Sequence, residues 1–230
     1  MSTPIVLVPG LYCTARVYSA QIPALWNHGP VTIADHTRED DVDAIAAQIL
    51  STAPARLALA GVSMGGYVAL AIQRAAPERI ERLALLSTAA TPDDERQKDV
   101  RRRGQALERE GRFEDILQAG WPLLAHPDHQ DDEALKDVMR EMHDAIGLDA
   151  SIRQLQAVMD RPDARPQLGS IDVPTLVLVG DEDRTTPPER AREMADAIPD
   201  ARLVVVPRAG HLVLLEQPDA TTRALADWLR

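Results

Sequence analysis

The amino-acid sequence predicts an α/β fold with a mainly parallel, doubly wound sheet of about six strands and an all-helical insertion. Three observations predict this fold class. Short apolar runs alternate with amphipathic stretches of about 10–15 residues, which is typical of βαβ units. The runs are continuously apolar, as in strands that are covered on both faces. The alternation stops between residues 91 and 166, where charged residues are dense.

Each predicted strand is a short run of Val, Ile, Leu and Ala that stops at a turn-forming or polar residue. The first is Ile5–Val8, which ends at Pro9-Gly10. The later strands are expected at residues 31–34, 56–62, 82–87, 173–179 and 202–206. Because helical patterns separate most of these strands, we expect them to pair in parallel.

The first two predicted helices lie between these strands. One begins near Pro23, which suits a first helical turn, with Leu25 and Trp26 expected on its buried side. Another begins at the acidic pair Asp40-Asp41, where carboxylates are favoured by the helix dipole. Further helices are expected after residues 63, 187 and 210.

Residues 91–166 are predicted to form a helical insertion, so that the core consists of residues 1–90 and 167–230. Asp131 is expected to cap one of its helices, because an apolar stripe at helical spacing follows it. The members of that stripe are Leu135, Val138, Met139, Met142 and Ile146.

Composition limits the classes of partner. The formal net charge of −11 argues against nucleic acid and anionic membrane surfaces. A single cysteine, Cys13, excludes an internal disulfide and a cysteine-based zinc cluster. We expect residues 126–133, which include two histidines, to be a solvated loop rather than a metal site. No apolar run approaches the roughly 20 residues of a membrane helix, and no signal peptide is recognisable, so a cytoplasmic protein is expected.

The turn at Gly61-Val62-Ser63-Met64-Gly65 joins a predicted strand to a predicted helix. This G-x-S-x-G pattern, in that setting, is typical of a serine nucleophile held on a tight turn. Glycines on both sides relieve the crowding that so sharp a reversal causes. The alternative interpretation is that Ser63 is an ordinary helix N-cap.

A nucleophilic serine needs a base, and the base needs an orienting acid. Histidine suits the role of base because its pKa lies near neutral pH. Ser63, Asp183 and His211 each follow a predicted strand, at the sheet edge where active sites collect. Asp181 is an alternative acid, and His36 is a less favoured alternative base that we expect in a surface loop.

These features resemble the α/β-hydrolase superfamily, and the resemblance covers the chain outside the insertion. It rests on Gly61–Gly66, Gly180–Pro187, Gly210-His211 and Glu216-Gln217-Pro218. The resemblance implies that Ser63, Asp183 and His211 are catalytic and that the insertion is a cap domain. It also implies that the backbone N–H groups of Leu11 and Met64 form an oxyanion hole. Many members carry His-Gly where this chain has Pro9-Gly10.

We therefore interpret the chain as a serine hydrolase that cleaves a small carboxylic ester, thioester or lactone, without a metal or cofactor. Tyr12 and Trp121 are candidates for the lining of the substrate pocket. The resemblance also allows a carbon–carbon bond hydrolase or a cofactor-free perhydrolase with the same three residues. A small-ligand receptor without turnover is the alternative from another functional class. The sequence predicts neither the acyl group nor the oligomeric state.

Overall fold

The computed structural model describes residues 2–230, which contain one six-stranded sheet. All of its strands run parallel, in the order β2-β1-β3-β4-β5-β6. They are β1 (Ile5–Val8), β2 (Val31–Ile33), β3 (Leu57–Val62), β4 (Ile80–Leu86), β5 (Thr175–Gly180) and β6 (Ala201–Val206). The predicted fold class is confirmed, and each predicted strand agrees with an observed one to within two residues.

The order of the strands reverses between β1 and β3. From β1 the chain moves outward to β2, then returns to β3 on the other side of β1 and continues to β6. Loops that leave the carboxyl ends of strands at such a switch point diverge and leave a crevice, where α/β proteins bind ligands. The loop after β1 and the turn after β3 both leave the sheet at this point.

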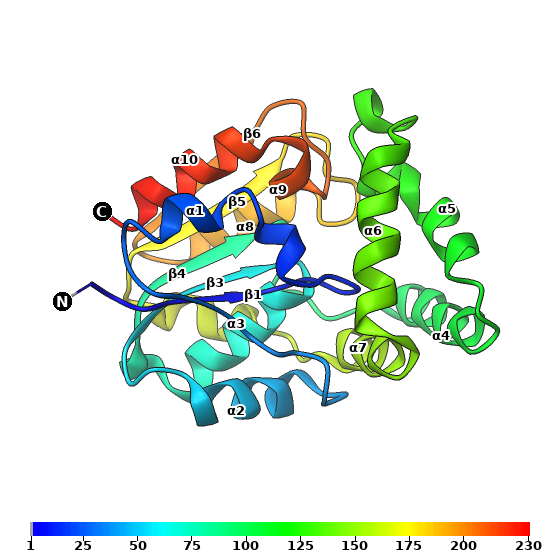
Figure 1. Cartoon of the computed structure of the whole chain (residues 1–230). Helices are drawn as coiled ribbons and strands as arrows, with labels where there is room; N and C mark the ends of the chain where they lie inside the picture. The colour runs from blue at the N-terminus through cyan, green and yellow to red at the C-terminus, as the bar shows by residue number, and fades with distance from the viewer. Residues whose placement is uncertain (1) are drawn as a thin grey trace.

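Helices cover both faces of the sheet (Figure 1). One face carries α2 (Val42–Thr52), α3 (Met64–Ala75) and α8 (Pro188–Ala197), and the other carries α1 (Ile22–Leu25) and α10 (Pro218–Trp228). Side chains alternate along β1 between the two resulting cores. Val6 and Val8 join the α2–α3 side, whereas Ile5 and Leu7 join the α10 side.

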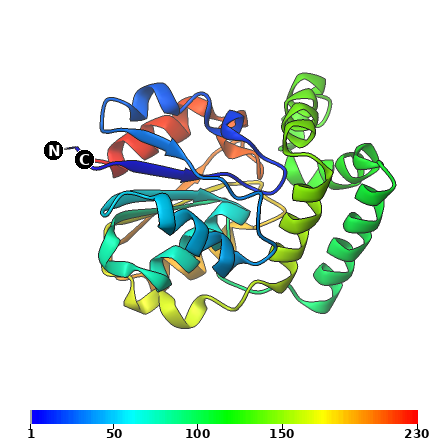
Figure 2. The same ribbon diagram turned by 60° about the horizontal axis from the view of Figure 1, so that its bottom comes forward.

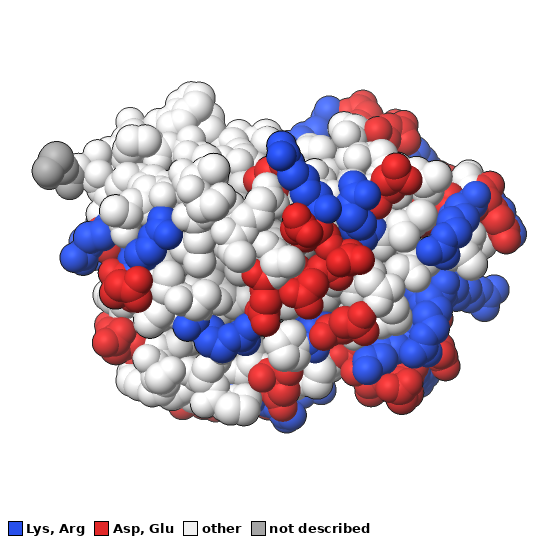
Figure 3. All heavy atoms as spheres, turned by 90° about the horizontal axis from the view of Figure 1, so that it is seen from below, with Lys and Arg blue, Asp and Glu red and all other residues white. Residues whose placement is uncertain are grey.

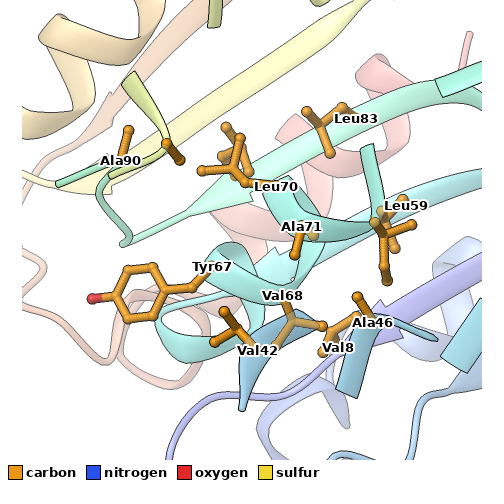
Figure 4. Close-up of a cluster of buried hydrophobic side chains, with 14 of the residues drawn as sticks. Val8, Val42, Ala46, Leu59, Tyr67, Val68, Leu70, Ala71, Leu83 and Ala90 are labelled. Atoms are coloured by element: carbon orange, nitrogen blue, oxygen red, sulfur yellow. The ribbon is translucent and has the colours of Figure 1, made fainter. Parts of the chain in front are cut away.

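On the α2–α3 side, the first turns of α3 pack directly against the sheet. Figure 4 shows Val68 and Ala71 of α3 in one cluster with Val42 and Ala46 of α2 and the strand residues Val8 and Leu59. These side chains are buried, and burial of apolar surface stabilises the fold by about 25 cal/mol per Å². Such packing leaves the beginning of α3, which carries the serine turn, little freedom to move.

Four helices between β4 and β5 form the helical insertion: α4 (Glu95–Arg109), α5 (Phe113–Leu124), α6 (Glu133–Ile146) and α7 (Leu148–Asp160). They lie beyond the carboxyl ends of the strands (Figures 1 and 2). Charged side chains of both signs crowd this end of the molecule (Figure 3). The short segments η1 (Ala15–Tyr18), η2 (Pro77–Arg79), η3 (Pro127–His129), η4 (Arg165–Ser170) and α9 (Val213–Glu216) complete the chain.

A buried ion pair joins the two points where the insertion meets the core. Asp93 precedes α4, Arg161 follows α7, and Arg161 Nη1 lies 2.6 Å from Asp93 Oδ1. The guanidinium also donates to the carbonyl of Thr91 and lies 4.2 Å from the ring centroid of Tyr67. Because Tyr67 belongs to α3, this contact ties the insertion to the helix that follows the serine turn.

Two expectations from the sequence are wrong in detail. Trp26 is 63% exposed, although Leu25 is buried as expected. Helix α1 has only four residues, too few for an apolar stripe, and Trp26 lies beyond its end. The cap of α6 is Asp132 rather than Asp131, because the side chain of Asp132 accepts the N–H of Leu135 at 3.0 Å.

None of the helices in residues 2–230 combines the length and the apolar character that a membrane span requires.

Candidate active site

Ser63 occupies a strained turn between β3 and α3, with φ 52° and ψ −117°. Its hydroxyl caps no N–H of α3, so the interpretation of Ser63 as an ordinary helix N-cap is wrong. A Cβ on Gly61 would overlap the backbone of Gly65, and a Cβ on Gly65 would overlap the carbonyl of Val8. The glycines are therefore required by close backbone approach, as the sequence predicts.

The structure brings Ser63, His211 and Asp183 together from three separate loops. His211 Nε2 lies 2.9 Å from Ser63 Oγ, and His211 Nδ1 lies 2.9 Å from Asp183 Oδ2. Ser63 follows β3, Asp183 follows β5 and His211 follows β6, so the parallel sheet aligns all three at one edge. Asp181 is directed elsewhere and accepts the N–H of Ala209.

Asp183 is a buried carboxylate with a full set of donors. Its Oδ1 accepts the N–H groups of Thr185 at 2.9 Å and Thr186 at 2.8 Å, and its Oδ2 accepts the hydroxyl of Thr186 at 2.9 Å. Burial raises the pKa of Asp183, but the charge of His211 and these hydrogen bonds outweigh it and hold the pKa below 3.8. The carboxylate is therefore ionised at neutral pH and can stabilise an imidazolium at His211.

Glu216 fixes the loop that carries His211. Its Oε2 accepts the N–H of Gly210 and its Oε1 accepts the N–H of His126, both at 2.6 Å. The N–H of His211 also donates to the carbonyl of Leu124, the last residue of α5, at 2.8 Å. The insertion thus contacts the histidine loop directly. The sequence marks Glu216 only as part of the Glu-Gln-Pro segment and does not indicate this role.

The loop after β1 lies against Ser63. A Cβ on Gly10 would stand 3.4 Å from the Cβ of Ser63. The Gly10 carbonyl is held by two groups, His36 Nε2 at 3.0 Å and the N–H of Cys13 at 3.1 Å. In a trans peptide the C=O and the following N–H point in opposite directions, so these contacts also fix the direction of the Leu11 N–H.

His36 is not a surface residue, which corrects the sequence-based expectation. Only 2% of its surface is exposed, and burial holds its pKa below the usual 6.5. A neutral imidazole with its proton on Nε2 donates to the Gly10 carbonyl. No local pattern predicts this contact, because it joins a loop after β2 to a loop after β1 across the sheet edge.

Tyr12 and Trp121 are both buried at the contact between the core and the insertion. The Tyr12 ring packs edge-on against Phe113 and His143, with centroids 5.3 and 5.6 Å apart. Trp121 donates its Nε1–H to the carbonyl of Gln130 at 3.0 Å. That they line a substrate pocket stays a prediction.

Two other kinds of reactive site are candidates in the sequence, a metal site and the Cys13 thiol. Among residues 2–230, no group of three or more His, Cys, Asp and Glu side chains is placed to hold a metal ion. Burial raises the pKa of the Cys13 thiol to about 12, which keeps this thiol protonated at neutral pH.

A model of the Alpha/beta hydrolase family matches residues 5–224. The chain belongs to this family. The match includes the sheet, the insertion and the loops that carry Ser63, Asp183 and His211, and membership of this family supports a hydrolase enzyme.

The chain is similar to proteins of different activities. An esterase from Thermogutta terrifontis, solved with malate bound, is 30% identical, with a TM-score of 0.88 over 100% of this chain and 90% of that chain. The enol-lactonase from Burkholderia xenovorans LB400 is 25% identical, with a TM-score of 0.87 over 100% of this chain and 92% of that chain. Polyketide synthase ThaQ from Burkholderia thailandensis is 32% identical over 98% of this chain, which spans only 12% of that protein's length.

Proposed function

We propose that this hydrolase cleaves a small carboxylic ester, thioester or lactone through an acyl-serine intermediate. The observation that carries the proposal is the unbroken hydrogen-bonded chain from Ser63 Oγ through His211 to Asp183. A serine hydroxyl is a weak nucleophile at its free pKa, and a histidine within 2.9 Å is the base that such a serine needs.

In the first half-reaction His211 Nε2 takes the proton of Ser63 as Oγ attacks the substrate carbonyl. Asp183, ionised at neutral pH, stabilises the imidazolium through Nδ1–H. The negative charge on the carbonyl oxygen is accepted by the backbone N–H groups of Leu11 and Met64. Each such donor is worth about 3 kcal/mol in the transition state.

In the second half-reaction His211 gives its proton to the leaving oxygen or sulfur, and the alcohol or thiol departs. Water then enters, loses a proton to the same Nε2 and attacks the acyl carbon. The proton finally returns to Ser63 Oγ and the carboxylic acid leaves. In a lactone the leaving oxygen stays attached to the acyl group, so the product is a hydroxy acid.

The known activities of similar proteins support this substrate class. The Thermogutta terrifontis protein is an esterase and the Burkholderia xenovorans protein is an enol-lactonase, and each is similar over the full length of this chain. The helical insertion would act as a cap that excludes water and selects the acyl group. Apolar residues at its contact with the core, among them Met139 and Met142, favour an apolar acyl group.

A panel of p-nitrophenyl esters, a thioester and a γ-lactone, assayed with native protein and Ser63→Ala, tests the proposal. Native protein should hydrolyse at least one member, and Ser63→Ala should lose at least about 10⁴-fold in kcat. Ser170→Ala is the matched control, because Ser170 is exposed and its hydroxyl only donates to the carbonyl of Gln167. Full activity in Ser63→Ala would contradict the mechanism. A native protein that binds panel members without turnover would favour the receptor function.

A further inference from the structure

A buried side chain of the helical insertion forms a hydrogen bond with the backbone of the loop beside Ser63. Gln154, on α7, accepts the backbone N–H of Tyr12 at its Oε1, at 2.9 Å. The two residues are 142 positions apart, and Gln154 is fully buried, with 0% of its surface exposed. A hydrogen bond in such a place is strong and directional, because no water competes for it.

Tyr12 has a backbone conformation that needs external support. Its φ of 63° lies in the left-handed region, which is uncommon for residues other than glycine, asparagine and aspartate. Such a conformation persists when the surroundings hold it. Here the insertion holds both parts of the residue: Gln154 binds the N–H, while Phe113 and His143 pack against the ring.

The peptide group that Gln154 holds is adjacent to the proposed oxyanion donor. The N–H of the Leu11–Tyr12 peptide donates to Gln154 Oε1, and its carbonyl oxygen accepts the thiol of Cys13 at 3.4 Å. The preceding peptide, Gly10–Leu11, carries the Leu11 N–H that is proposed to bind the oxyanion. Since the two peptides share the Cα of Leu11, a shift of that Cα moves both.

Gln154 has a further property that packing alone does not explain. Its Nε2 is buried and has no hydrogen-bond partner among residues 2–230. A buried amide with an unused donor is less favourable than an apolar side chain of the same size. Replacement of Gln154 by such a side chain would, however, leave the Tyr12 N–H without an acceptor.

We propose that Gln154 is a positioning residue that acts from the insertion, together with the contacts of the Gly10 carbonyl, to hold the direction of the Leu11 N–H. The inference rests on the proposed function, because it assigns Gln154 a part in oxyanion binding. It makes the insertion a component of the catalytic machinery in addition to a cover for the substrate. The oxyanion site is then complete only while α7 lies against the loop after β1.

The test compares Gln154→Met with Gln105→Met in the full-length protein. Gln105 is also a buried glutamine of the insertion, and its amide donates to the carbonyl of Ile152 on α7. The two variants therefore remove the same group from neighbouring sites. Hydrolysis of a p-nitrophenyl ester gives kcat and KM, and hydrogen exchange followed by NMR gives the protection of the Tyr12 amide.

Gln154→Met should lower kcat about tenfold with KM within about twofold, because loss of a whole donor costs on the order of 10²–10³ in kcat and a displaced donor costs less. The Tyr12 amide should exchange faster than in native protein. Gln105→Met should keep native kcat and native exchange at Tyr12. If Gln154→Met does not fold, Gln154→Asn, whose shorter side chain withdraws the acceptor, should give the same two changes.

A native kcat in the folded Gln154 variant would overturn the proposal. An equal fall of kcat in Gln105→Met would also overturn it, since the effect would then reflect the stability of the insertion. A native protein that hydrolyses no ester contradicts the proposed function instead. In that case the exchange rate of the Tyr12 amide still reports whether Gln154 holds the loop.

Discussion

The sheet core and the helical insertion meet the candidate active site in different ways. Strands β3 and β5 are buried along their whole length, and the loops that follow them carry Ser63 and Asp183. The insertion adds apolar side chains to the cores on both faces of the sheet, whereas it contacts the backbone of the site loops through hydrogen bonds. Gln154 binds the loop after β1, and His126 and Leu124 bind the loop of His211 through Glu216 and the backbone.

This difference separates two roles. The stabilisation from apolar packing is roughly proportional to the area that is buried. Many residues therefore contribute to the position of the strands, and one substitution changes that position little. Hydrogen bonds depend on direction, and each hydrogen bond from the insertion to the backbone of a site loop involves only one donor and one acceptor. The core therefore supplies the reacting side chains, and the insertion adjusts the groups around them.

The largest expected effect tests the role of the core. His211→Ala removes the base and should lower kcat by at least about 10⁴-fold, because nucleophile and base act as a unit. His28→Ala is the control, since His28 lies in the turn after α1 and is distant in the sequence from the three candidate catalytic residues. Steady-state ester hydrolysis is the measurement. A fall of less than tenfold in His211→Ala would mean that another group removes the serine proton.

The next effect concerns the ion pair at the base of the insertion. Asp93→Asn leaves the buried guanidinium of Arg161 without its counter-charge and should lower the free energy of unfolding by about 3 kcal/mol. Asp227→Asn removes the exposed pair with Arg230 and should change it by no more than about 0.5 kcal/mol. Urea titrations measure both. Equal effects of the two variants would show that the buried pair has no special role in attaching the insertion.

A smaller effect is expected at His36, the contact of the core with the loop after β1. His36→Leu removes the donor to the Gly10 carbonyl and should lower kcat about tenfold with little change in KM. His36→Gln places an amide N–H at similar reach and should restore kcat to within about threefold. Equal kcat values in His36→Leu and His36→Gln would contradict a role of the hydrogen bond to the Gly10 carbonyl.

The smallest effect is a pH dependence of stability. Because burial lowers the pKa of His36 below 6.5, the unfolded chain binds this proton more readily than the folded chain. The free energy of unfolding should therefore fall as the pH drops below about 6.5. The fall should end once the pH lies below the lowered pKa of His36 in the folded state. His36→Gln should lose less stability between pH 7.5 and pH 5 than native protein. An identical loss in both, measured by urea titration, would contradict the burial of a neutral His36.

Local sequence patterns account for most of the core. The continuous apolar runs predict the strands because burial on both faces leaves little place for polar residues. Ser63 is predictable because its turn requires glycines at fixed positions, and Asp183 and His211 because each follows a recognisable strand. Only the family resemblance favours Asp183 over Asp181 in the sequence, since the choice depends on how the loop after β5 turns.

The positioning contacts could not be predicted in the same way. His36 and Gln154 bind backbone groups of the loop after β1 from positions 26 and 142 residues away. Neither contact depends on a repeating pattern, because each is made by one side chain after the elements have packed. Trp26 shows the opposite difficulty. Its size suggests burial, but a four-residue helix does not direct it toward the core.

The claim that Ser63 is a nucleophile activated by the core can be tested most directly with a fluorophosphonate and intact-mass spectrometry. Native protein should gain one adduct per chain, and peptide mapping should locate it on Ser63. Ser63→Ala should gain none, and His211→Ala should react far more slowly because its serine keeps its proton. A native protein that remains unlabelled, or that carries its adduct on another residue, would contradict the proposed mechanism.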